Sequence, residues 1–140
     1  MSKIVELLKS SGYSSRAIEY YLNKVDVGVI ETPSIHFAYT GPCNDTMEVF
    51  LKIESNIIKD AKFLAVGCAG AFASGSALME LIKGKTLEEA KKIDEEDIIE
   101  YLGRLPKPKI HCACLAKRTL RKTLEQYRKM GTRTDEKDQS

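Results

Sequence analysis

Hydrophobic residues near the start of the chain recur every three or four positions, which is the spacing of an amphipathic helix. The pattern covers two stretches between residues 4 and 25. Gly12-Tyr13 interrupts it, and either Ser14 or Ser15 can cap the second stretch. The pattern predicts two short helices, or one broken helix, in an N-terminal extension over residues 1–27, followed by a loop.

From position 34 onward the pattern changes to alternation, which is typical of half-buried β-strands. Alternating stretches cover residues 34–39, 47–54 and 61–66, and residues 57–60 lead into the last of them. Short links that contain Gly-Pro or Ser-Asn separate the stretches. Because short links join neighbouring antiparallel strands, we predict a three-stranded meander.

Three helices are then marked by their sequence. Residues 69–83 are mostly small and apolar, and Gly84 ends this stretch. Thr86 begins the second helix with a capping box, and Asp94 begins the third, which ends near Gly103. Small residues would let the first of these helices approach another element closely, and they are Ala71, Ala73, Ser74, Gly75, Ser76 and Ala77.

The last helix is predicted over residues 112–130. Residues 105–109 before it cannot be helical, because their prolines lack backbone donors and restrict the preceding residues. Gly131 stops the helix, and the polar tail from 132 to 140 is expected to be disordered. We therefore expect one α+β domain over residues 1–131. The apolar stripe of the last helix consists of Leu115, Ala116, Leu120, Thr123, Leu124 and Tyr127.

Composition and charge narrow the possible partners. The 140 residues suit one domain with a core, and the net charge of +2 selects no partner. The charge is segregated into an acidic stretch over residues 88–100 and a basic one over residues 104–133. The basic stretch fits a solvated helix face as well as a docking surface for an acidic partner. Nucleic acid is not expected as a partner, because no aromatic residues interleave the basic ones.

The chain has no apolar run long enough to cross a bilayer and no signal-peptide segment at its N-terminus. We therefore expect a cytoplasmic protein without a membrane partner. Four cysteines in such a chain indicate metal ligands or reactive thiols, because disulfides are rare in that compartment.

The cysteines and their polar neighbours stand at the ends of predicted elements. Cys43 and Asp45 are two positions apart in an extended stretch, so their side chains point to the same side. Cys68 lies at a strand-to-helix junction, and Cys112, preceded by His111, lies at a loop-to-helix junction. A helix N-terminus favours the thiolate, which is the form that binds metal and attacks sulfur. These positions predict one metal site, with zinc and iron both open.

Each residue taken alone has a plainer interpretation. A single cysteine is most often a small buried hydrophobe, and Asp45 could simply cap a turn. The other histidine, His36, is expected to be a structural hydrogen-bonding residue. The combination of these residue types at three element ends is what favours the metal site.

Around these positions the chain resembles the iron–sulfur cluster assembly scaffolds of the IscU/NifU N-terminal type. The resemblance covers residues 17–129 and implies a three-stranded antiparallel sheet with helices packed mainly on one face and a long C-terminal helix. Its motifs are Gly41-Pro42-Cys43-Asn44-Asp45, Val66-Gly67-Cys68-Ala69, Gly84-Lys85-Thr86-Leu87-Glu88-Glu89-Ala90, and Lys109-Ile110-His111-Cys112-Ala113 with Leu115-Ala116.

The resemblance implies a scaffold and carrier rather than an enzyme. Such a protein accepts sulfur from a cysteine desulfurase, combines it with iron, and transfers the nascent cluster, expected to be 2Fe-2S, to apo-proteins. The implied cluster ligands are Cys43, Cys68 and Cys112, with Asp45 and His111 as accessory ligands, and zinc can occupy the same site. Cys112 is the expected persulfide acceptor, because it follows an exposed loop and lies at a helix N-terminus.

The chain departs from the family pattern in three places. Asn44 replaces the usual Gly, but asparagine tolerates a positive φ well, so the turn is expected to persist. Residues 105–109 match only three positions of the Leu-Pro-Pro-Val-Lys motif that a dedicated Hsp70-type chaperone reads, which weakens the expectation of that partner. Cys114 is an extra thiol that points away from Cys112 on a helix, so we expect it to pack against the core, with a role as reserve ligand as the alternative.

Three competing functions are compatible with parts of the sequence. A zinc-bound SUF-type sulfur acceptor would stimulate a desulfurase without building clusters, but such relatives carry an insertion before the last cysteine and Lys where this chain has His111. A structural zinc module is a second alternative. A thiol oxidoreductase is the weakest, because the chain has no C-x-x-C motif.

Overall fold

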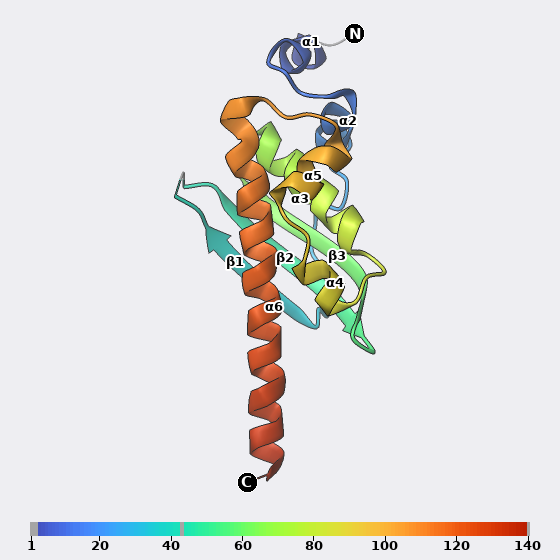
Figure 1. Cartoon of the computed structure of the whole chain (residues 1–140), viewed down its shortest axis with the longest axis vertical. Coiled ribbons are helices and arrows are strands. Elements are labelled where there is room, and N and C mark those ends of the chain that lie inside the picture. The colour runs from blue at the N-terminus through green and yellow to red at the C-terminus, as the bar shows by residue number, and fades with distance from the viewer. Residues whose placement is uncertain (1–2, 43, 140) are drawn as a thin grey trace.

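The computed structural model describes residues 3–42 and 44–139, with side chains in these ranges as far as Met130 (Figure 1). Two short helices, α1 (Lys3–Ser10) and α2 (Ser15–Asn23), form the N-terminal extension. Ser14 caps α2, because its side-chain oxygen accepts a hydrogen bond from the backbone amide of Ala17. The extension therefore holds two separate helices, one of the two arrangements that the sequence predicts.

A three-stranded antiparallel sheet follows in the order β1-β2-β3, as the alternation of residues predicts. The last strand is longer than predicted and begins at Ile57 rather than at residue 61. Ser55 and Asn56 cause this difference, because both have positive φ (52° and 66°) and form the two-residue turn of a tight hairpin. The strands are β1 (Ile35–Thr40), β2 (Thr46–Glu54) and β3 (Ile57–Val66).

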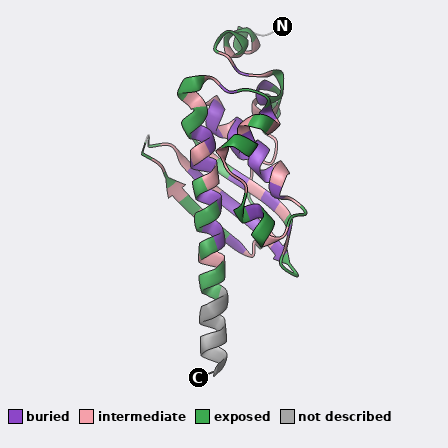
Figure 2. Cartoon of the chain, in the orientation of Figure 1, coloured by how far each residue is buried: buried purple, intermediate pink, exposed green. Residues whose placement is uncertain are grey.

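The later helices cover mainly one face of this sheet, as Figures 1 and 2 show. On that face Met47, Val49 and Leu51 of β2 are fully buried, and together with residues of α3 and α6 they belong to one hydrophobic core. The arrangement confirms the α+β fold predicted from the sequence. The helices are α3 (Ala69–Ile82), α4 (Leu87–Lys91), α5 (Glu95–Leu102) and α6 (Ile110–Gln139).

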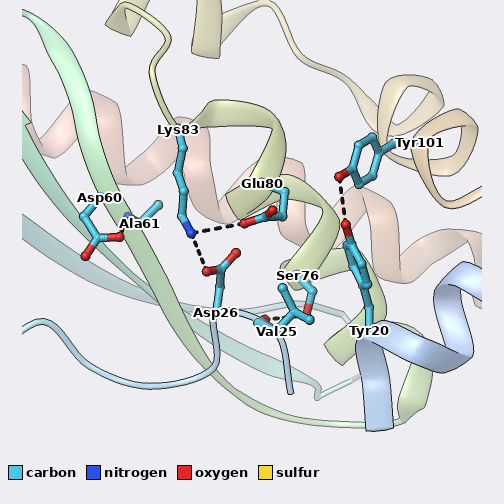
Figure 3. A network of polar contacts seen from close by, with 9 residues as sticks. All are labelled: Tyr20, Val25, Asp26, Asp60, Ala61, Ser76, Glu80, Lys83 and Tyr101. Carbon is cyan, nitrogen blue, oxygen red and sulfur yellow. Dashed lines mark hydrogen bonds and ion pairs between the residues drawn. The ribbon is translucent and has the colours of Figure 1, made fainter. Parts of the chain in front are cut away.

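Polar contacts attach the end of the N-terminal extension to α3 (Figure 3). The hydroxyl of Ser76 donates a 2.7 Å hydrogen bond to the carbonyl of Val25, and the Lys83 ammonium lies 2.5 Å from the Asp26 carboxylate. Burial is the main cause that raises the pKa of Asp26 to about 6. These contacts fix the extension on the helix whose N-terminus carries Cys68.

Local capping chemistry is borne out, whereas two predicted boundaries are not. Thr86 and Asp94 cap α4 and α5 with reciprocal capping boxes. The sequence predicts no helix over residues 105–109, but Lys107–Lys109 form a short 3₁₀ helix. Proline is tolerated there because it lies in the first turn, where an amide donor is not needed. Among the described residues, no helix is both long and apolar enough to cross a membrane.

The C-terminal helix α6 is longer than predicted at both ends. It begins at Ile110, directly after the 3₁₀ turn, and its backbone continues through Gly131 to Gln139, where the sequence predicts a disordered tail. Glycine costs about 1 kcal/mol inside a helix relative to alanine, and no proline follows it to end the helix. The division into a domain of residues 1–131 and a separate tail stays a prediction.

Candidate metal centre

Three segments far apart in the sequence meet at one end of the molecule. One possible ligand atom from each of Asp45, His111 and Cys112 lies within 4.8 Å of the other two. The sulfur of Cys68 lies 3.6 Å from the sulfur of Cys112. The structure thus brings together four of the five predicted ligands, and the fifth, Cys43, lies outside the described residues.

Two glycines allow this close approach. A Cβ atom at Gly67 would lie 3.0 Å from the Asp45 carboxyl carbon, and one at Gly70 would lie 3.2 Å from the Cys112 sulfur. The turn before β2 is closed by a 2.9 Å hydrogen bond from the amide of Gly41 to the carbonyl of Asp45. Asn44 in this turn has a φ of 67°, which agrees with its predicted tolerance of the left-handed region.

The two cysteines share one negative charge. Cys68 occupies the N-cap position of α3. A hydrogen bond from Cys112, together with the backbone amides of Ala71 and Gly70, lowers the pKa of Cys68 to about 5. The hydrogen bond to Cys68 and burial raise the pKa of Cys112 far above its ordinary value. The sequence predicts thiolates at both positions, whereas the pair holds Cys68 as the thiolate and Cys112 as the thiol that donates to it.

The burial of Cys112 differs from the expectation that it follows an exposed loop. Cys112 is fully buried, because α6 already begins at Ile110 and places Cys112 on the inner side of its first turn. Cys68 is half-buried, and His111, whose Nε2 atom lies 3.7 Å from the Cys112 sulfur, is exposed. The exposed loop on which the sequence prediction for Cys112 relied therefore does not expose its thiol in this conformation.

Tyr13 is a neighbour of the centre that sequence reasoning missed. Tyr13 is buried, and its hydroxyl lies 3.4 Å from the place that a Cβ of Gly70 would take. The Cys112 sulfur lies 3.2 Å from the same place. Burial is the largest cause that raises the pKa of Tyr13 to about 12, and the charges of Cys68 and Cys112 add to it. The break at Gly12-Tyr13 between two helices was the only sequence signal at this position.

The two remaining chemical candidates lie in different surroundings. Cys114 is half-buried and lines a cavity beside Asp45 and His111, which corrects the expectation that it packs against the core. The Nδ1 atom of His36 lies 3.0 Å from the carboxylate of Glu48, and its ring stacks on Phe50, so it is a structural hydrogen-bonding residue as predicted.

The donor set at the centre is chemically mixed. It combines the sulfurs of Cys68 and Cys112, the imidazole of His111 and the carboxylate of Asp45. Zinc and iron both accept such a combination of sulfur, nitrogen and oxygen, whereas magnesium and calcium prefer oxygen alone. The residues present therefore fit a thiophilic metal ion or an iron–sulfur cluster.

Similar solved structures share this fold. A crystal structure of FiSufU from Fervidobacterium islandicum AW-1, described as a cluster assembly scaffold protein for the SUF system, superposes with a TM-score of 0.67 at 26% identity and covers 80% of this chain and 96% of that one. The N-terminal part of a NifU-like protein from Brucella abortus has a TM-score of 0.68 at 17% identity, covers 82% of this chain and 93% of that one, and supports the fold alone.

Relatives of higher identity agree with these structures. The iron–sulfur cluster assembly scaffold protein IscU 1 of Archaeoglobus fulgidus is 41% identical over 121 residues, which cover 85% of this chain and 79% of that protein. The scaffold protein IscU of Azotobacter vinelandii is 39% identical and covers 83% of this chain and 94% of its own length. The sequence model of the NifU-like N terminal domain matches residues 12–134. The chain belongs to this NifU-like N-terminal domain family.

Proposed function

We propose that this protein is a scaffold for the assembly of iron–sulfur clusters. It accepts sulfur from a cysteine desulfurase, combines it with iron, and transfers the nascent cluster, of the 2Fe-2S type, to apo-proteins in the cytoplasm. The observation that carries the proposal is the convergence of Asp45, Cys68, His111 and Cys112 at one site. Relatives named as cluster assembly scaffolds support it.

The proposed ligands of the cluster are these four residues together with Cys43. A thiolate-rich site suits iron and sulfur, since cysteine thiolates hold most protein-bound clusters. The cluster is cargo that the protein builds and releases, so the scaffold acts by binding and orienting. Zinc is proposed as an alternative occupant, because it takes the same donors.

Sulfur acceptance is proposed to occur on Cys112. Its thiolate attacks the outer sulfur of the desulfurase persulfide, the bond between the two persulfide sulfurs breaks, and the desulfurase thiolate leaves, so no external oxidant is consumed. The Nε2 atom of His111 and the thiolate of Cys68 both lie within 3.7 Å of the Cys112 sulfur and can take its proton. Because Cys112 is buried, the step requires the first turn of α6 to open.

Cys68 is the competing acceptor, because it is more exposed and is the thiolate of the pair. Mapping the persulfide by mass spectrometry after incubation with a desulfurase and cysteine distinguishes the two residues. We expect the extra sulfur on Cys112 in the unaltered protein and in Cys68→Ala. A persulfide on Cys68 alone would move the acceptor role to that residue.

Anaerobic reconstitution with iron, cysteine and a desulfurase tests the scaffold function itself. We expect visible absorption bands of a 2Fe-2S cluster and their transfer to an apo-ferredoxin. The second candidate function is a zinc-bound sulfur acceptor of the SUF type, which the structural likeness to FiSufU favours. Zinc that stays bound while no cluster forms would support that candidate instead.

A further inference from the structure

A cavity of about 260 Å³ borders the candidate metal centre and extends beyond the proposed ligands. At one end it is lined by Asp45 and His111, both of which belong to the group of possible metal ligands. Tyr39, Pro42 and Leu115 supply apolar walls. A molecule in this cavity would therefore have one end next to the metal.

The other polar residues of the cavity come from α6. Cys114 and Arg118 are four positions apart on this helix, so their side chains lie on the same face. Arg118 is exposed, and no ion pair or hydrogen bond joins it to another described side chain. The ammonium of Lys122 lies 5.2 Å from the centre of the Tyr39 ring and adds a second positive charge on this side. The outer end of the cavity therefore favours an anionic group.

We propose that this cavity binds a small thiol that carries a carboxylate, a molecule of the size and class of free cysteine. The thiolate lies toward the metal, because zinc and iron favour soft sulfur donors, and the carboxylate lies toward Arg118, because a guanidinium matches its two oxygens. The inference rests on the proposed metal centre, since the thiol needs a metal to bind.

Size and charge select this class of ligand. Pockets for drug-sized molecules measure roughly 300–1,000 Å³, so a cavity of about 260 Å³ suits a smaller molecule, such as an amino acid. A cysteine within a partner's polypeptide has no α-carboxylate, so a separate acidic side chain of that partner would be needed to pair with Arg118. The cavity thus favours a free small molecule over a protein loop.

Cobalt provides a spectroscopic test, because sulfur bound to Co²⁺ gives charge-transfer absorption in the near ultraviolet. The full-length protein is loaded anaerobically with Co²⁺ and titrated with 3-mercaptopropionate. We expect a saturable increase in this absorption. 2-Mercaptoethanol, which lacks the carboxylate, should bind about tenfold more weakly, and propionate, which lacks the thiol, should not increase the absorption.

Two variants and one matched control place the ligand in the cavity. Arg118→Gln should weaken 3-mercaptopropionate about tenfold, which corresponds to about 1.4 kcal/mol, and leave 2-mercaptoethanol unchanged. Cys114→Leu fills the cavity and should prevent thiol binding while Co²⁺ still binds. Arg121→Gln is the control, because Arg121 lies on the same helix but donates to the carbonyl of Ile93 instead.

The possible outcomes separate this inference from the proposed function. If the unaltered protein binds Co²⁺ with sulfur charge transfer but 2-mercaptoethanol binds as well as 3-mercaptopropionate, the inference is overturned and the metal centre stands. The same holds if Arg118→Gln has no effect, or if the thiol removes Co²⁺ from the protein. If Co²⁺ does not bind to the cysteines at all, both the centre and the inference fail.

Discussion

Asp45 is the least usual member of the candidate centre, because a carboxylate is a hard ligand among soft ones. Its possible ligand atom lies within 4.8 Å of those of His111 and Cys112, so it can share their metal. Iron–sulfur clusters are held most firmly by thiolates, and a hard oxygen donor is a weaker long-term partner. A scaffold must release what it builds, so a weak ligand serves that function.

Replacing Asp45 with Ala is therefore expected to give a longer-lived cluster. The measurement is the decay of visible absorption of the reconstituted protein after anaerobic addition of a chelator or an apo-acceptor. Glu54→Ala, which removes an exposed carboxylate at the far end of β2, serves as the control and should leave the decay unchanged. Faster loss in Asp45→Ala would show that the carboxylate holds the cluster rather than releasing it.

The Cys68–Cys112 pair makes a prediction about pH. A lowered pKa means that Cys68 is a thiolate above about pH 5, so its alkylation by iodoacetamide should reach half of its plateau near that pH in the metal-free protein. Cys112→Ala removes the main cause of the shift and should move the midpoint toward the value of an ordinary cysteine, roughly 8.5. Mass spectrometry of the Cys68 peptide gives the rate at each pH. A midpoint above 8 in the unaltered protein would contradict the shared proton.

At this scale the sequence indicates which residues meet but not how they share charge. Each of Asp45, Cys68 and Cys112 lies near the end of an element, and local patterns place such ends to within a few residues. The charge of Cys68 depends on the sulfur of a residue 44 positions away, at 3.6 Å, and on the burial of that residue. A local sequence pattern cannot predict a contact between residues so far apart in the chain, so it cannot predict the charge of Cys68.

The small residues of α3 are the clearest link between sequence pattern and packing. A Cβ atom at Gly75 would lie 2.5 Å from the ring of Phe63 on β3, so the helix touches the sheet where the glycine has no side chain. The close approach that the sequence predicts for this helix is thereby confirmed. It also positions the N-terminus of α3, and with it Cys68, over the end of the sheet.

Gly75→Ala tests this contact, because two effects oppose each other. Alanine favours a helix by about 1 kcal/mol, whereas forcing a methyl group into a packed core costs about 1–3 kcal/mol. Since the clash is with a fully buried ring, we expect the packing cost to prevail, with a net destabilisation of about 1 kcal/mol in urea unfolding. The same change in a Phe63→Leu background should cost less, because the smaller side chain leaves room. A more stable Gly75→Ala would show that the helix does not rest on Phe63.

Element boundaries were predictable where a local cap decides them. Thr86 begins α4 by bonding to a residue three positions later, and such chemistry is visible in the sequence. The 3₁₀ turn at 107–109 and the extra length of α6 are not decided by caps. Both features depend on small free-energy differences between alternative backbone conformations. The turn at 107–109 runs directly into α6, which packs on the core.

The sequence predicts the basic stretch to be either a solvated helix face or a docking surface for an acidic partner, but two of its residues on α6 serve packing instead. Lys117 pairs with Glu95 at 2.5 Å, and Arg121 donates to the carbonyl of Ile93, so both hold α6 against the end of α4 and the start of α5. Arg118 makes no such contact within the described chain and lines the cavity instead. Part of the charge therefore serves packing, and part is left for a ligand.

At the scale of the molecule, the centre lies at the edge of the hydrophobic core, and among its described members only Cys112 is fully buried. The core contains residues of the sheet and of α2, α3, α5 and α6, and Cys68, Asp45 and His111 lie at its edge. The N-terminal extension is tied to the segment before α6, since Ser14 donates to the carbonyl of Leu102 at 2.6 Å. We expect this apolar core to supply folding free energy without a metal, which a structural zinc module cannot do.

Chelation distinguishes a scaffold from a structural zinc module. A zinc module unfolds when its metal is removed, because the metal supplies its folding free energy. Here we expect the metal-free protein to keep the far-ultraviolet circular dichroism of the zinc-bound one and to unfold cooperatively on heating. Zinc at a hundred times its dissociation constant should still add about 2.7 kcal/mol to the free energy of unfolding by mass action and raise Tm by about 10 °C.

In Cys68→Ala the rise in Tm should shrink, because the ligand is lost while the core is intact. Loss of the dichroism signal on chelation would mean that the metal holds this fold together, and that the site is structural first.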